Sequence, residues 1–202
     1  MTWVTHEADQ LRIVAEIESQ SDRGAALVAA SFVDARLTEA ISLRFDPNVD
    51  PTVRGRVLRG SGALATFSAK IDVGLMLSLY PPSVHVMLNK IRDIRNDFAH
   101  EVMPMSFQTP SVSDRCHNLL PVLVSTFLDA MDHYTKLEAH LGYPAQQHWY
   151  GTFTGEGVIT GPHAARSYFM QAVKQSLMHL SRAMDVFGPH QLSPSTLPKM
   201  SA

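Results

Sequence analysis

The sequence of 202 residues is poor in cysteine and in charge of either sign. Its single cysteine, Cys116, excludes an intrachain disulfide and a zinc site built from cysteines, and it suits a reducing compartment. The formal net charge is only −2, so the chain lacks the bulk positive charge of a protein that wraps nucleic acid. No apolar run at the N-terminus has the length of a signal or a membrane span. We therefore predict a cytoplasmic protein that has no membrane partner.

Sequence signatures of metal and nucleotide sites are also missing. There is no H-E-x-x-H, no phosphate-binding G-x-x-x-x-G-K-[ST] and no nucleophile elbow. His133 and His140 stand seven residues apart on a predicted helix, which separates them by about 10 Å. That distance is too long for two ligands of one metal ion. We expect neither a metal site nor a cofactor.

What the sequence does contain is helical periodicity. Hydrophobic residues make up 45% of the chain and recur at three- and four-residue spacing, whereas strand-like alternation is absent before residue 142. The pattern predicts an all-α bundle of six or seven helices, and the candidate segments are residues 1–20, 25–45, 63–80, 82–101, 111–119, 121–141 and 162–187. The segment at 25–45 is apolar on nearly every side of its first half, which is typical of a central helix.

The composition predicts a single domain over residues 1–187. Residues 142–162 are rich in glycine and aromatic residues, and they predict an inserted loop or a small hairpin. A flexible tail is expected from 188 to 202, where three more prolines occur.

The stretch from Ile91 to His100, IRDIRNDFAH, is the centre of the predicted fold. One face of its helix is apolar and should lie in the core, and its members are Val84, Met87, Leu88, Ile91, Ile94 and Phe98. The opposite face is polar and gathers Asn89, Asp93, Asn96 and His100, whereas Arg92 and Arg95 lie on a flank of the apolar face. The short Pro81-Pro82 turn predicts that this helix packs antiparallel to the helix at 63–80.

The motif R-N-x-x-x-H, from Arg95 to His100, resembles the R-x(4–6)-H signature of the HEPN superfamily of helical domains. Four blocks in order resemble the mannitol operon repressor (MtlR) family over about residues 20–120, and they are Asp22–Leu27, Phe67–Asp72, Ile91–His100 and Ser106-Phe107. The resemblance implies an MtlR/HEPN-like helical bundle.

The resemblance to active HEPN nucleases implies one possible function, a metal-independent endoribonuclease acting on RNA in a toxin or defence role. In that case Arg95 and His100 would be catalytic, and Asn96 would orient them. The chemistry fits, because histidine moves protons near neutral pH and the arginine fork stabilises the charge that builds on phosphorus. On a straight helix, however, Arg95 and His100 point about 140° apart. They could converge if the helix ended before His100, or if two copies faced each other across a two-fold axis.

The resemblance to the MtlR family implies a second function, regulation of the transcription of a sugar-alcohol operon. Nothing in the sequence looks like a helix-turn-helix with a basic recognition helix, so we do not expect direct, sequence-specific reading of DNA. Regulation would then act through an unknown protein partner, and Arg95, Asn96 and His100 would form a structural polar cluster. We favour this hypothesis, and we expect a homodimer with the polar face of the Ile91 helix near its two-fold axis.

Residues 50–63 contain Arg54, Arg56 and Arg59 among three glycines. We interpret this segment as a solvated loop between helices. The alternative is a mobile basic loop whose arginines contact phosphate.

Overall fold

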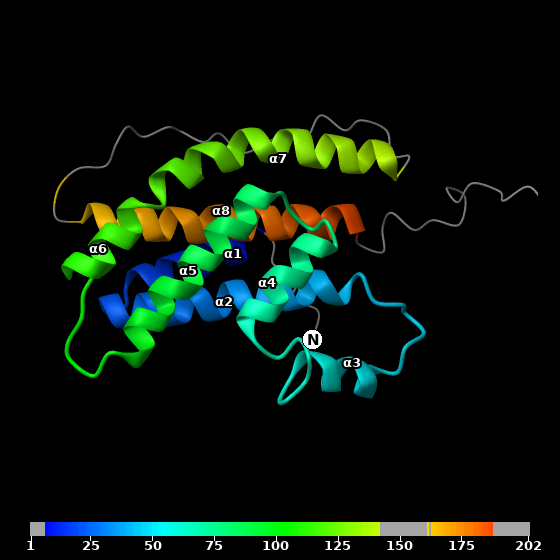
Figure 1. The fold of residues 1–202 in the computed structure, drawn as a ribbon, viewed down its shortest axis with the longest axis horizontal. Helices are drawn as coiled ribbons and strands as arrows, with labels where there is room; N and C mark the ends of the chain where they lie inside the picture. The colour runs from blue at the N-terminus through cyan, green and yellow to red at the C-terminus, as the bar shows by residue number, and fades with distance from the viewer. Residues whose placement is uncertain (1–6, 142–160, 162, 188–202) are drawn as a thin grey trace, which may run out of the picture.

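The computed structural model describes residues 7–141, 161 and 163–187, and within them the chain forms eight α-helices and no strand (Figure 1). This confirms the all-α prediction. The helices are α1 (Glu7–Glu18), α2 (Asp22–Ser42), α3 (Pro51–Leu58), α4 (Phe67–Met76), α5 (Pro82–His100), α6 (Pro110–His117), α7 (Leu120–His140) and α8 (Ala164–Phe187). In Figure 1, α2, α7 and α8 run along the long axis of the molecule, and α5 crosses them obliquely.

Helix α2 is central, as its apolar composition predicts. It is capped by Ser21, whose side chain accepts a hydrogen bond from the backbone N–H of Gly24. It packs against α1, α4, α5 and α8. The buried residues of its first half are mostly alanines, which let the neighbouring helices approach closely: Ala25, Ala26, Ala29 and Ala30.

Helices α4 and α5 run in opposite directions, as predicted, but α4 is shorter than the segment at 63–80. It ends at Met76 because Ser78 adopts a left-handed conformation with φ of 56°. The chain then turns back, and the hydroxyl of Tyr80 donates to the carbonyl of Ile71 at 2.7 Å. A Cβ atom on Gly74 would lie 2.4 Å from that hydroxyl, so the turn requires glycine at this position.

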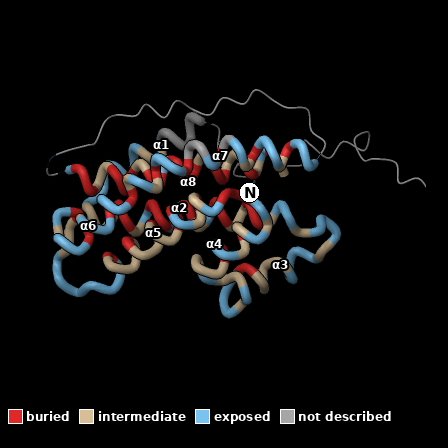
Figure 2. Tube along the Cα trace, turned by 45° about the horizontal axis from the view of Figure 1, so that its top comes forward, coloured by how far each residue is buried: buried red, intermediate tan, exposed pale blue. Residues whose placement is uncertain are grey.

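The apolar face of α5 lies in the core, which confirms the prediction for that face. Leu88, Ile91, Ile94 and Phe98 are all fully buried. The ring of Phe98 packs edge-to-face on Phe107, which in turn packs on Phe169 of α8. Figure 2 shows the buried positions concentrated along the helices of the bundle, whereas α3 at its edge is mostly exposed or half-buried. The aromatic contacts of Phe98, Phe107 and Phe169 fix α5 against α8.

The prediction of a loop at residues 50–63 is wrong, because part of the segment is helix α3. The carboxylate of Asp50 caps the helix by accepting from the N–H of Thr52 at 2.7 Å. Pro51 occupies the first helical turn, where its missing N–H costs no hydrogen bond. The Asp50 cap and Pro51 favour a helix strongly enough to tolerate Gly55 inside it. The loop prediction was wrong because it gave the glycines more weight than these two signals. This helix accounts for eight helices where six or seven were expected.

Two predictions fall outside the described residues. They are the loop or hairpin at 142–162, of which only Gly161 is described, and the tail at 188–202. No helix that the structure describes is both long and apolar enough to cross a membrane.

Candidate functional site

Arg95 and Asn96 line a cleft where α2, α4 and α5 meet. Its volume is about 360 Å³, near the lower end of the range of small-ligand pockets. The lining residues come from the three helices and the residues before α4, and they are Ala30, Ser31, Asp34, Ala65, Thr66, Phe67, Ser68, Arg92, Arg95 and Asn96. We call this the α5 cleft. Most of its lining side chains are polar.

The first turn of α4 contributes backbone donors to the α5 cleft. The hydroxyl of Thr66 accepts from the N–H of Ala69 at 3.1 Å and caps the helix. Among the described residues, the N–H groups of Phe67 and Ser68 have no acceptor. This is the ordinary condition of a first helical turn, and it favours negative charge nearby.

Two ion pairs occur at the α5 cleft, and each has one member, Arg92 or Asp34, among the lining residues. The guanidinium of Arg92 pairs with Asp93 at 2.7 Å and donates to the hydroxyl of Ser68 at 3.0 Å. The ammonium of Lys70, which is only 5% exposed, pairs with Asp34 at 2.7 Å. Of the three charged residues that line the cleft, Arg92 and Asp34 are therefore paired.

Arg95 is the third charged residue that lines the cleft. Its Nη1 donates to the side-chain oxygen of Asn96 at 3.0 Å. In the part of the chain that the structure describes, no carboxylate lies within ion-pair distance of its guanidinium. Asn96 therefore fixes the direction of a half-buried guanidinium without neutralising it.

His100 does not join Arg95 and Asn96 in the α5 cleft. It is exposed and is the last residue of α5, so the helix continues through it. Five residues on a continuous helix leave the two side chains about 140° apart. Of the two routes to convergence, the early end of the helix is thus excluded. A single chain brings Arg95 and Asn96 together and leaves His100 outside.

The chain after His100 is held by Arg23. Its guanidinium donates to the carbonyl oxygens of Glu101 and Met103, at 2.7 and 3.0 Å. Val102 between them is 89% exposed. The two hydrogen bonds fix the backbone on both sides of Val102.

The four blocks that resemble the MtlR family lie together around α5. Asp22 accepts from the backbone N–H of Phe107 at 3.0 Å, which links the first block to the last. The hydroxyl of Ser68 in the second block binds Arg92 in the third. Asp22, Ser68 and Arg92 of these blocks therefore have structural roles.

The three arginines of residues 50–63 do not gather at the α5 cleft. Arg54 donates from Nε to the carbonyl of Val49 at 3.1 Å, and its Nη2 donates to the carbonyls of Asp46 and Pro47. It thereby holds the turn between α2 and α3. Arg56 and Arg59 are exposed.

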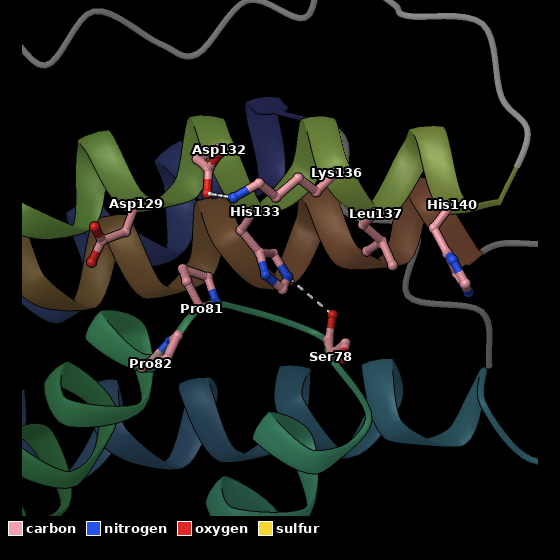
Figure 3. A pocket seen from close by; sticks show the side chains of 9 residues that line it. All are labelled: Ser78, Pro81, Pro82, Asp129, Asp132, His133, Lys136, Leu137 and His140. Carbon is pink, nitrogen blue, oxygen red and sulfur yellow. Dashed lines mark hydrogen bonds and ion pairs between the residues drawn. The ribbon is translucent and has the colours of Figure 1, made fainter.

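A second cleft, of about 590 Å³, lies between α7 and the α4–α5 turn (Figure 3). His133 reaches across it and donates from Nε2 to the carbonyl of Ser78 at 3.1 Å. At the rim, Asp132 and Lys136 pair with each other at 2.6 Å. In Figure 3 the ring of His140 lies apart from that of His133. Most polar groups here bind one another, so this cleft mainly clamps the turn against α7.

Two histidines near this cleft are shifted by burial. Burial lowers the pKa of His133, although its hydrogen bond to the Ser78 carbonyl acts in the opposite direction. Burial also lowers the pKa of His179 to about 4, and the nearby His133 adds to the effect. The ring of His179 stacks on Tyr134, whose hydroxyl donates to the backbone carbonyls of His179 and Leu79. Both histidines are neutral packing elements at pH 7.

The described residues offer little for other kinds of chemistry. No three His, Cys, Asp or Glu side chains among them are grouped so that they could hold a metal ion. Burial raises the pKa of the Cys116 thiol to about 12, so it is a poor nucleophile at neutral pH. The α5 cleft, with its spare guanidinium, is the better candidate site.

We compared the chain with known proteins, and no family model, no curated protein and no solved structure matches it. The fold and the site therefore define a class only: an all-α bundle with an arginine-lined cleft between three helices. The resemblance to the MtlR family and the HEPN superfamily stays a prediction.

Sequence reasoning found Arg95 and Asn96 but missed the rest of the α5 cleft. Arg92 could be placed only on the flank of an apolar helical face. Ser31 and Asp34 carried no signal, because they belong to another helix that only the tertiary fold brings to α5. Ser68 lay inside a block that resembles the MtlR family, which was the one available hint.

Proposed function

We propose that this protein is a regulator that acts by binding another protein, and that the partner docks at the α5 cleft. One observation carries the proposal: Arg95 and Asn96 share a cleft from which His100 is absent. The cleft thus has a group that binds an anion, whereas the proton-transfer group of a ribonuclease lies elsewhere. Resemblance to the MtlR family adds that the regulated process is transcription of a sugar-alcohol operon.

A homodimer is part of this proposal. The end of α5 presents exposed His100 beside Val102 and Met103, which are 89% and 67% exposed. Apolar side chains held outward by a fixed backbone favour association. Light scattering should give the mass of a dimer at micromolar concentration, and a monomer would contradict this part of the proposal.

The second candidate is a metal-independent endoribonuclease, favoured by a different observation. The guanidinium of Arg95 is not neutralised and His100 is exposed, so each is free to meet a group of a second copy. Across a two-fold axis, Arg95 of one protomer could approach His100 of its partner.

RNA cleavage in EDTA distinguishes the two functions. A regulator leaves RNA intact over long incubation. A nuclease yields products with 2′,3′-cyclic phosphate ends, because the 2′-OH is the nucleophile. In that case His100→Ala should abolish cleavage, since proton transfer contributes about 10²–10⁴-fold to the rate. Arg95→Lys should also abolish cleavage, because lysine keeps the charge but lacks the planar guanidinium. If the wild type cleaves RNA and His100→Ala loses this activity at unchanged stability, the proposal of a regulator is overturned.

Partner binding is tested by placing a photo-crosslinking amino acid at Ser31, which lines the α5 cleft, in cells that express the protein. The matched control carries the same group at Arg56, which is exposed and lies outside the cleft. We expect one discrete protein adduct from position 31 and none of that mass from position 56. Equal adducts from both positions would contradict docking at the cleft.

A further inference from the structure

We propose that the α5 cleft recognises a single carboxylate of the protein partner, the side chain of an Asp or a Glu, held by Arg95. This inference rests on the proposed function and adds the chemistry of the docking group. It follows from the charge balance of the cleft, from the donors that remain free and from the shape of the guanidinium.

The charge balance leaves room for one negative charge. Arg92 is neutralised by Asp93 and Lys70 by Asp34, whereas Arg95 has no carboxylate partner among the described residues. One monoanion would therefore complete the cleft. A second negative charge would find no further unpaired cation among the lining residues.

The free donors suit a planar acceptor. One terminal nitrogen of the Arg95 guanidinium is engaged by Asn96, which leaves the edge formed by Nε and Nη2 without a partner in the described residues. That edge matches the two oxygens of a carboxylate in a bidentate arrangement. Asn96 already holds the guanidinium in place, so little side-chain freedom is lost on binding.

The first turn of α4 supports the same ligand. The N–H groups of Phe67 and Ser68 have no acceptor within the described chain, and both residues line the cleft. The positive end of the helix dipole adds to the attraction for an anion. The contribution from α4 is secondary to the guanidinium, because the first turn carries only partial charge.

A strand of RNA fits this arrangement less well than a peptide does. Nucleic-acid binding depends on several Lys or Arg side chains that neutralise successive phosphates. Here a single cation is spare, so the phosphates on either side of a bound one would find no second unpaired cation among the lining residues. The acidic formal charge of −2 for the whole chain adds no compensating field.

The test begins with a phage library of random peptides selected on the full chain. We expect the selected peptides to share an Asp or a Glu. For the tightest synthetic peptide, replacing that residue by Asn or Gln should weaken binding about 10- to 100-fold, the range for a lost charge-assisted hydrogen bond. Arg95→Gln should cause a similar loss, and the matched control Arg56→Gln should cause none. A short single-stranded RNA should not displace the peptide.

Each other result overturns the inference. Selected peptides without a shared acid, or no selected peptide at all, would show that the cleft does not recognise a carboxylate. Full binding by Arg95→Gln would place the contact elsewhere, although a protein-binding function would stand. If RNA displaces the bound peptide, and its binding to the protein requires Arg95, the nuclease function is favoured. Replacing the shared Asp or Glu of the peptide by Asn or Gln tests the inference even if an Arg95 variant folds poorly, because the protein itself is unchanged.

Discussion

The inner face of α5 and the flank beside it differ in the hydrogen-bonding capacity that their side chains leave free. On the inner face Ile91, Ile94 and Phe98 are fully buried in one core. On the flank that lines the α5 cleft, Arg92 is paired with Asp93, whereas Arg95 has no carboxylate partner among the described residues. The inner face therefore contributes to stability, and the flank keeps a group available for binding. One helix carries both, which means that the two properties can be changed separately by mutation.

The same difference separates the two clefts. In the cleft of Figure 3, His133 and the pair of Asp132 and Lys136 are bound to groups of the chain itself. In the α5 cleft the guanidinium of Arg95 has donors to spare. The volume of a cleft is thus a weaker guide to function than the hydrogen-bonding capacity that remains free inside it.

The largest expected effect tests the inner face. Phe98→Ala should lower the free energy of unfolding by about 3–5 kcal/mol, because it removes a buried ring and leaves a cavity beside Phe107. Urea titration measures this. The matched control is Ala99→Ser, one residue on and exposed, with little expected change. A loss below about 1 kcal/mol for Phe98→Ala would reverse the assignment of the two faces.

A titratable group in the interior offers the next test. His179 is buried, its pKa in the folded protein is about 4, and its ordinary value is 6.5. The fold therefore favours the neutral ring. The neutral ring contributes about 3 kcal/mol to the free energy of unfolding. This contribution is complete above pH 6.5 and is lost as the pH falls toward 4. Urea unfolding at pH 7 and pH 4.5 should show less loss in His179→Phe than in the wild type. Equal losses would mean that His179 is accessible to solvent when charged.

A smaller effect is expected for the ion pair beside the α5 cleft. Asp34→Asn leaves the ammonium of Lys70 almost fully buried, with the hydroxyl of Thr38 at 2.9 Å as its remaining partner. The free energy of unfolding should fall by about 1–3 kcal/mol. Adding Lys70→Met should restore part of the loss, because the unpaired charge is gone. If thermal melting shows no difference between the single and the double variant, the pair has no role in stability.

The smallest expected effect tests the flank of α5 that lines the cleft. Arg95→Gln should change the free energy of unfolding by less than about 0.5 kcal/mol, because the side chain is half-exposed and has no ion pair to lose. Chemical denaturation of both proteins at pH 7 measures it. A loss comparable to that of Asp34→Asn would make Arg95 a structural residue and would weaken its assignment to binding.

Much of the fold could be predicted from the sequence. The periodicity of Ile91, Ile94 and Phe98 correctly placed the inner face of α5, because a helix repeats its face every three or four residues. The apolar composition of α2 correctly made it central. Helix α3 was missed, since the start signals at Asp50 and Pro51 had to be weighed against glycines that suggested a loop.

The sequence by itself determined the class of the fold and the presence of Arg95, Asn96 and His100 on one helix. Helical periodicity and the offset of about 100° per residue are local properties, so they also set the divergence of Arg95 from His100. Only the tertiary structure decided which neighbours complete the site. It brought Ser31 of α2 and Ser68 of α4 to the cleft that Arg95 lines, paired Lys70 with Asp34, and placed the hydroxyl of Ser68 against Arg92. Those contacts join residues far apart in the chain, and local pattern does not encode them. Arg92 and Arg95 meet Asp93 and Asn96 at the next position in the chain, whereas the cleft around the free guanidinium was settled by packing between helices.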